Sequence, residues 1–193
     1  MKERILTSLL TVFVISGIQA QAPSPVPRLV VGLTIDQLRA DYIEAFSALY
    51  GERGFKRLLK EGRIYTNAEY DFINVDRSSA TASIYTGTTP YYNGIPSNRW
   101  MDRGSLRIIK SVDDQDFMGV YTSENSSAKL LRCSTLSDEL KVATQGRAEV
   151  YSIAPTREMA VLAAGHAANG AFWLNDETGK WLARLTMVIA RCG

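Results

Sequence analysis

The residues that could do chemistry gather in one stretch, NVDRSSATASIYTGTTPYYNGI, at positions 74–95. Asp76 and Arg77 are followed there by Ser78 and Ser79, at the expected start of a helix that ends near Gly87. A hydroxyl at a helix start lies in the positive field of the helix N-terminus. With a metal ion to lower its pKa, such a hydroxyl suits phosphoryl transfer. The alternative is that Ser78 and Ser79 only cap the helix through their side chains.

A carboxylate that could hold this metal follows the first apolar run. LVVGLTI, residues 29–35, is continuous and rich in β-branched residues, which predicts a buried strand of a parallel sheet. Asp36 comes directly after it, at the carboxyl end of the predicted strand, where ligands bind in such sheets. Asp36 is therefore a candidate metal ligand. The alternative is a solvated side chain that caps the following helix.

Predicted strands and helices alternate along the rest of the chain. Ser134 or Thr135 is expected as the N-cap of one helix, because the pattern STLSDEL contains a capping box. The alternation predicts an α/β sandwich with a mostly parallel sheet. Helices are predicted at 36–50, 54–62, 79–87, 134–144 and 156–165, strands at 29–35, 63–72, 148–154 and 170–176, and a hairpin with its turn at Arg103-Gly104 at 98–112.

The first residues predict export. A basic start, an apolar run over 5–18 and a small residue at Ala20 are typical of a signal peptide over residues 1–20, with a Pro-rich linker at 21–27. The apolar run is short for a membrane span of about 20 residues, although an uncleaved anchor is the alternative. The cleaved product is expected to be periplasmic or secreted and to have no membrane partner.

A net charge of +2 without a basic block argues against nucleic acid as a partner. Cys133 and Cys192 could form a disulfide, but the sequence does not decide this.

Several motifs in order resemble one family. VVGLTIDQLRADY, GFKRLLKEG, IYTGTTPYYNGI, SNRW, STLSDEL and AGHAANGAFWLNDETGKW resemble the alkaline phosphatase superfamily. The sequence is similar to exported bacterial alkaline phosphatases of the type I phosphodiesterase/nucleotide pyrophosphatase branch, over about residues 28–181. The resemblance implies an alkaline-phosphatase-like α/β core and a two-zinc hydrolase of small-molecule phosphate esters. In this family a Thr or Ser is phosphorylated and then released by water.

The resemblance implies roles for some residues and raises a conflict at the nucleophile. Asp36 matches a zinc ligand, and Asn98 matches an Asn that contacts phosphate. The nucleophile's place falls on Arg77, and Thr81 stands where the family commonly has His. Ser78 would be the catalytic hydroxyl if the helix start slipped by one residue. Arg77 itself either holds the substrate anion or forms an ion pair on the surface with Asp76 or another neighbour.

A second departure lies before the AGH motif. The family's Lys and Arg that grip phosphate fall on Thr156 and Glu158, and Arg157 between them could compensate in part. Glu158 would repel a phosphate dianion. His166, the single histidine, is expected to be structural, the alternatives being a metal ligand or a general base.

The end of the sequence gives a third reason to expect no activity. The family's other zinc ligands lie beyond the matched region, so Asp36 alone would not complete a two-zinc site. One allowed coding from Trp181 onward, read in another frame, gives Ala-Ser-Ser-Thr-Tyr-Tyr-Gly, which is similar to the family's continuation. Residues 182–193 are therefore hypothesised to be out of frame. The chain is expected to be inactive; the alternatives are a non-catalytic anion-binding relative and a truncated product without function.

Overall fold

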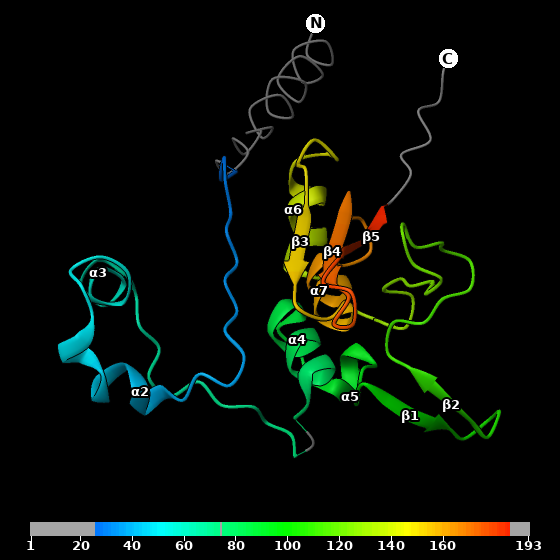
Figure 1. Cartoon of the computed structure of the whole chain (residues 1–193), viewed down its shortest axis with the longest axis horizontal. Coiled ribbons are helices and arrows are strands. Elements are labelled where there is room, and N and C mark those ends of the chain that lie inside the picture. Colours follow the sequence, from blue (N-terminus) through cyan, green and yellow to red (C-terminus); the bar gives the residue numbers. More distant parts are fainter. Residues whose placement is uncertain (1–25, 74, 186–193) are drawn as a thin grey trace, which may run out of the picture. The chain divides into compact units, whose positions relative to one another are not determined.

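The computed structural model describes residues 26–73 and 75–185 (Figure 1). The chain divides into two units, Met1–Gly32 and Leu33–Gly193, and every helix and strand named below belongs to the second. The predicted signal peptide, most of the predicted linker and residues 186–193 lie outside the described residues. Among the described helices, none has the length and apolar character needed to cross a membrane.

The predicted strand at 29–35 is wrong. These residues form neither helix nor strand, and Leu29, Val31 and Leu33 are each about four-fifths exposed. The strand predicted at 63–72 is also wrong, because these residues form neither helix nor strand. A strand persists only when neighbouring strands bond its N–H and C=O groups, and no described strand pairs with either segment.

The helical predictions after Asp36 hold in shortened form. The expected helix at 36–50 becomes α2, Ala40–Ala45, followed by the 3-10 turn η1, Ser47–Leu49. Gln37 has a φ of 60°, which no α-helix contains, so the helix begins after it. Helix α3, Phe55–Glu61, ends at Gly62 as predicted. None of these three elements buries a residue, so the predicted apolar face is not covered by the described chain.

Helix α4 and the hairpin follow local signals in the sequence. Helix α4, Arg77–Thr86, ends at Gly87, which takes the left-handed conformation with a φ of 67°. A short helix α5, Pro90–Asn93, leads toward β1, Arg99–Asp102, and β2, Arg107–Lys110. These two strands pair antiparallel around the predicted turn.

The second half of the chain builds a small three-stranded sheet. Strand β3, Tyr151–Ala154, pairs parallel with β4, Gly170–Leu174, because helix α7, Arg157–Ala164, crosses between them. Strand β5, Trp181–Leu185, follows β4 after a short turn and therefore pairs antiparallel. The mixed α/β class is confirmed, but a mostly parallel sheet is wrong for the described sheets. Helix α6, Leu136–Ala143, precedes β3 and begins at Thr135, with the predicted capping box.

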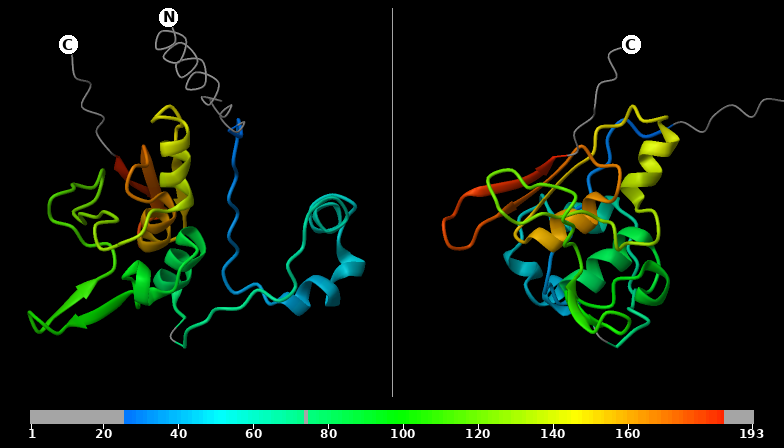
Figure 2. Two further views of the ribbon diagram at one scale, coloured as in Figure 1. Left: turned by 180° about the vertical axis from the view of Figure 1, so that it is seen from behind. Right: turned by 90° about the vertical axis from the view of Figure 1, so that its right-hand side faces the viewer.

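The core lies around α7, which packs against α4 and against strands β3 and β4 (Figure 2). Val161 and Leu162 of α7 are fully buried, as is Ala82 of α4, and Trp173 of β4 is 2% exposed. Burial of these side chains holds the start of α4 against the rest of the unit.

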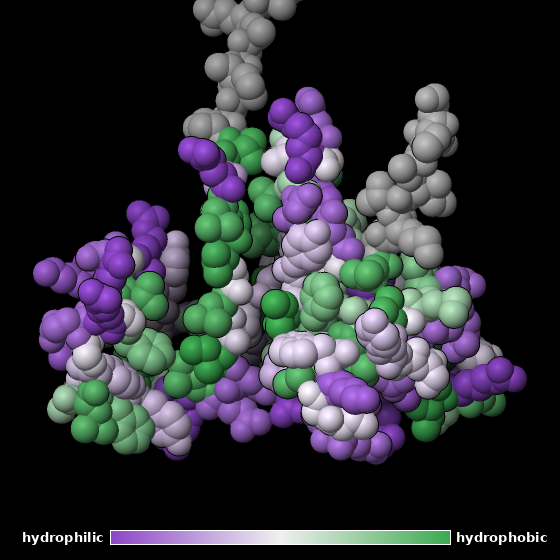
Figure 3. Space-filling view, turned by 45° about the horizontal axis from the view of Figure 1, so that its top comes forward, coloured by the Kyte–Doolittle hydropathy of each residue, from purple (hydrophilic) through white to green (hydrophobic). Residues whose placement is uncertain are grey.

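Many apolar side chains remain outside this core. Tyr151 and Ile153 of β3 are 56% and 70% exposed, and β3 is an edge strand of the described sheet. Figure 3 shows such hydrophobic residues, in green, at the surface among polar ones. An exposed apolar edge strand favours association with other chains.

Candidate functional site

The start of helix α4 is organised by Asp76, which is its N-cap. The Asp76 carboxylate accepts hydrogen bonds from the Ser79 backbone N–H at 2.9 Å, from Ser97 Oγ at 2.7 Å and from the Asn98 N–H at 2.6 Å. Partial burial alone would raise the pKa of Asp76, but these hydrogen bonds outweigh it and hold the pKa below its ordinary value. Asp76 thus fastens the loop before β1 to the first turn of α4.

The two serines behave differently. Ser79 completes a capping box with Asp76, so the capping interpretation is confirmed for Ser79. Ser78 does not cap the helix: its hydroxyl is fully buried and shares a hydrogen bond of 2.8 Å with Ser111 Oγ. Its backbone N–H donates to Asn98 Oδ1 at 3.1 Å. A hydroxyl buried in this way cannot meet a substrate unless the start of α4 opens.

Arg77 lies on the opposite, exposed side of the first turn and forms an ion pair with Asp36. The distance from Arg77 Nε to Asp36 Oδ2 is 2.9 Å, and the two side chains are 49% and 41% exposed. Arg77 therefore forms an ion pair at the surface with Asp36 and not with Asp76, and its predicted binding of a substrate anion stays a prediction. The four predicted site residues make two contacts, Arg77 with Asp36 and the Ser78 N–H with Asn98, and the two contacts meet at the neighbouring residues Arg77 and Ser78. Their chemical roles stay predictions.

Tyr70 is a fifth residue whose electrostatics depend on Asp36. Burial raises the pKa of the Tyr70 hydroxyl, and the negative charge of Asp36 raises it further. Tyr70 therefore keeps its proton well into the alkaline range. No pattern in the sequence indicates that Tyr70 lies near Asp36.

The described residues do not fit a zinc centre. Zinc sites in proteins use three or four His, Cys, Asp or Glu ligands, and within 26–73 and 75–185 no group of three such residues is placed to hold a metal ion. The one predicted ligand, Asp36, instead contacts the Arg77 guanidinium.

Arg157 does not compensate for the missing phosphate-gripping side chains. Its side chain is 7% exposed and lies 2.8 Å from Asp113, with Glu124 and Glu158 at 3.7 and 3.9 Å. Three carboxylates around one buried guanidinium leave little positive field for a phosphate. Arg157 therefore joins α7 to the loop after β2, and the predicted partial role in phosphate binding finds no support in its contacts.

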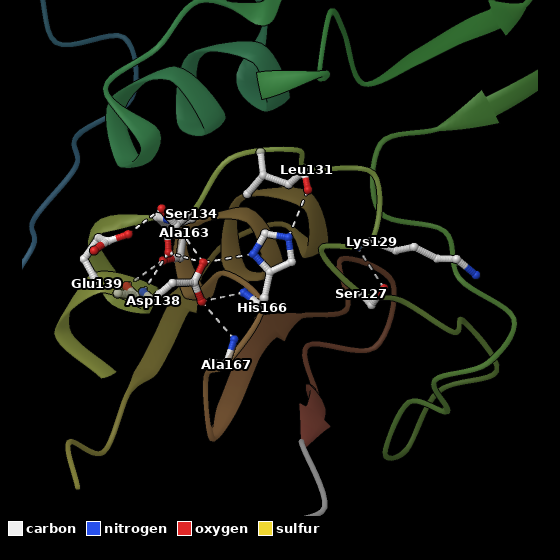
Figure 4. A network of polar contacts seen from close by, with 11 residues as sticks. Ser127, Lys129, Leu131, Ser134, Asp138, Glu139, Ala163, His166 and Ala167 are labelled. Atoms are coloured by element: carbon white, nitrogen blue, oxygen red, sulfur yellow. Dashed lines mark hydrogen bonds and ion pairs between the residues drawn. The ribbon is translucent and has the colours of Figure 1, made fainter. Parts of the chain in front are cut away.

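His166 has the predicted structural role (Figure 4). Its Nδ1 lies 2.9 Å from Asp138 Oδ2 and its Nε2 lies 2.9 Å from the Leu131 carbonyl oxygen. Both partners accept, so both ring nitrogens can donate at once only in the imidazolium form. The hydrogen bond to Asp138 raises the pKa of His166 against the opposing effect of burial, the Leu131 bond adds to the rise, and Arg184 opposes it.

Asp138 is the hub of this network. It accepts from the Thr135 N–H, from the backbone N–H groups of His166 and Ala167 and from the His166 ring. Burial alone would raise the pKa of Asp138, but the hydrogen bonds from His166, Thr135 and Ala167 hold it far below its ordinary value. The pair joins helix α6, the turn after α7 and the loop at Leu131.

The hydrogen bond between His166 and Asp138 makes the stability of the fold depend on pH, and we expect this stability to fall as the pH rises. The pKa of His166 is higher in the folded than in the unfolded chain, where it is about 6.5. The contribution of His166 is therefore complete below about pH 6.5 and is lost as the pH rises through the folded pKa. That of Asp138 is present above its unfolded pKa of about 3.9 and is lost only in stronger acid. We expect the urea midpoint to decline above about pH 6.5 in the wild type and to decline less in His166→Gln. Equal slopes for the two proteins would contradict this assignment.

Arg184 of β5 is buried without full compensation. Its side chain is 3% exposed, its Nε and Nη1 atoms have no hydrogen-bond partner among the described residues, and its guanidinium lies 5.2 Å from the ring centre of Phe117. Burial lowers the pKa of Arg184, and the negative charge of Asp114 offsets this in part. A buried, incompletely bonded cation is unfavourable for folding.

The hypothesis that residues from 182 onward are out of frame stays untested, although 181–185 form a paired strand.

Comparison with known proteins places these features in a family. The type I phosphodiesterase/nucleotide pyrophosphatase family matches residues 30–184. The alkaline phosphatase PhoV of Synechococcus elongatus is 41% identical over 160 residues, and the alkaline phosphatase PafA of Elizabethkingia meningoseptica is 37% identical over 181 residues. The crystal structure of wild-type PafA superposes with a TM-score of 0.76 at 35% identity. The chain belongs to the alkaline phosphatase superfamily and is similar to PhoV and PafA.

The match covers most of this chain but a minor part of its relatives. It spans 81% of this chain and 29% of PhoV, and 90% of this chain and 33% of PafA. For the PafA structure the corresponding shares are 82% and 31%. The chain thus spans about a third of the length of the relatives it matches.

Proposed function

We propose that the described part of this chain is the portion of a phosphate-ester hydrolase core that faces the substrate, and that it does not itself hydrolyse phosphate esters. The observation that carries this proposal is the arrangement at the first turn of α4. Arg77, which the order of motifs predicts at the family's nucleophile position, is paired with Asp36, while the hydroxyl of Ser78 is fully buried against Ser111. The turn therefore presents a guanidinium in place of a hydroxyl.

A second candidate function, the binding of a phosphate ester without its hydrolysis, is favoured by donors that the ion pair does not use. Within the described residues, Arg77 donates only through Nε, and the Asn98 side-chain amide accepts through Oδ1 but donates to nothing. Both side chains lie at the surface. A guanidinium and an amide with donors to spare are groups that can bond the oxygens of a phosphate monoester dianion. Export to the periplasm or medium is part of the same proposal, because the first residues have the pattern of a signal peptide.

Hydrolysis assays test the proposal. We expect the full chain to release no nitrophenol from 4-nitrophenyl phosphate or from bis(4-nitrophenyl) phosphate above the rate of zinc-containing buffer. The reason is that no exposed hydroxyl lies at the nucleophile position. A cooperative urea transition of the same sample establishes that the protein assayed is folded.

The control is the Ser78→Ala variant. If the wild type hydrolysed either ester in the presence of zinc and Ser78→Ala did not, the buried serine would be the nucleophile and the proposal would be wrong. Activity equal in both proteins would exclude Ser78 but would still contradict the expected lack of hydrolysis.

A further inference from the structure

The carboxylate that the family uses as a metal ligand already has a cation of its own in this chain. Arg77 reaches Asp36 from the first turn of α4, 41 residues away in sequence, with 2.9 Å between Nε and Oδ2. The described residues supply no further ligands around Asp36 that would make a metal preferable. A guanidinium is a cation without any bound metal. Asp36 therefore has a positively charged partner that needs no cofactor.

The guanidinium is held by one edge only. Its Nε faces Asp36, and within the described residues its two Nη groups donate to no protein atom. Half of the side chain is exposed, so these groups are open to an anion from solvent. The exposed Asn98 amide is linked to the same turn through Ser78.

We propose that Arg77 is a built-in cation that replaces a metal ion at Asp36, so that this turn binds a phosphate monoester dianion without metal. The inference rests on the proposed non-hydrolytic binding function and deepens it. Asp36 has a different role under this proposal than in a metal site. It orients the guanidinium through Nε, and it also weakens the attraction of Arg77 for an anion because its negative charge lies beside the same group.

This difference gives the two arrangements opposite responses to one substitution. If Asp36 held a metal, Asp36→Asn would remove a ligand, and both metal and anion binding would fall. If Arg77 is the cation, Asp36→Asn removes a competing charge, and anion affinity rises by about two- to fivefold, the range of an exposed ion pair.

The experiment is calorimetric titration of the full chain with phenyl phosphate at low ionic strength, in EDTA and again with zinc. The variants are Arg77→Gln, Asp36→Asn and a matched control, Glu61→Gln. Glu61 is chosen because it forms an exposed pair with Arg57 at the same Nε–O distance of 2.9 Å. Zinc binding is measured separately by equilibrium dialysis on the same proteins.

We expect the wild type to bind phenyl phosphate with the same affinity in EDTA and in zinc. Arg77→Gln should abolish this binding and Asp36→Asn should strengthen it. Glu61→Gln should leave the affinity unchanged within error. Binding that requires zinc and weakens in Asp36→Asn would overturn the inference. If no protein bound phenyl phosphate, both the proposed binding function and the inferred anion site would be wrong. Dialysis would then test separately whether Asp36 binds zinc. Equal zinc binding by wild type and Asp36→Asn supports Arg77 as the replacement for a metal ion, and a loss of zinc binding in Asp36→Asn refutes that replacement.

Discussion

Replacing Asp138 with alanine is expected to lower the free energy of unfolding by roughly 2–4 kcal/mol, through loss of a buried charged acceptor of several hydrogen bonds. Asp138 is 10% exposed at its side chain and accepts from the His166 ring and from three backbone N–H groups. Without the carboxylate the fully buried Thr135 N–H is left without this acceptor, whereas the His166 ring, 42% exposed, can bond water instead. Urea unfolding monitored by circular dichroism measures the change.

Glu139 is the matched control for Asp138. It is the next residue of helix α6, but it is exposed, and within the described part of the chain its carboxylate accepts only from Ser134. Glu139→Ala should change the free energy of unfolding by less than about 1 kcal/mol. If the two alanine variants were equally stable, the Asp138–His166 network would not hold this part of the fold together.

Replacing Asp76 with alanine is expected to lower the free energy of unfolding by about 2–4 kcal/mol, through loss of a helix cap and of hydrogen bonds to a charged acceptor. The same change should release Ser97 and Asn98 from the start of α4, because Asp76 is their common acceptor. Urea unfolding gives the stability, and phenyl phosphate titration reports whether Asn98 still supports the site.

An asparagine at the same position separates the two effects. Asp76→Asn keeps an N-cap of equal quality but removes the charge. It should therefore recover part of the stability lost in Asp76→Ala. A stability as low as that of Asp76→Ala would show that the charge, rather than the cap, holds the turn.

Elements specified by nearby residues could be predicted from the sequence. Helix α6 begins at Thr135 because Thr135 and Asp138 bond each other's backbone, and α4 ends at Gly87 because a left-handed residue there suits glycine. Such signals need only three or four residues of context. The strand predicted at 29–35 needed partners on both sides, and composition alone could not say whether they were present.

The same distinction explains the site. The match of Asp36, Arg77 and Asn98 to family positions came from the order of motifs, and the structure brings these residues together. The partners of two side chains could not be predicted, because Asp36 lies 41 residues from Arg77 and Ser111 lies 33 residues from Ser78. The Asp76 cap was missed, although an aspartate three residues before Ser79 is the local pattern of an N-cap.

The most direct test of the central claim is whether the protein ever carries a phosphoryl group. Intact-protein mass spectrometry after incubation with 4-nitrophenyl phosphate and zinc, quenched in acid, would detect a covalent adduct on a serine or threonine. We expect the wild-type chain to keep its unmodified mass, because the order of motifs predicts Arg77 at the nucleophile position and the structure buries Ser78. A phosphoryl adduct on the wild type that disappears in Ser78→Ala would contradict the account.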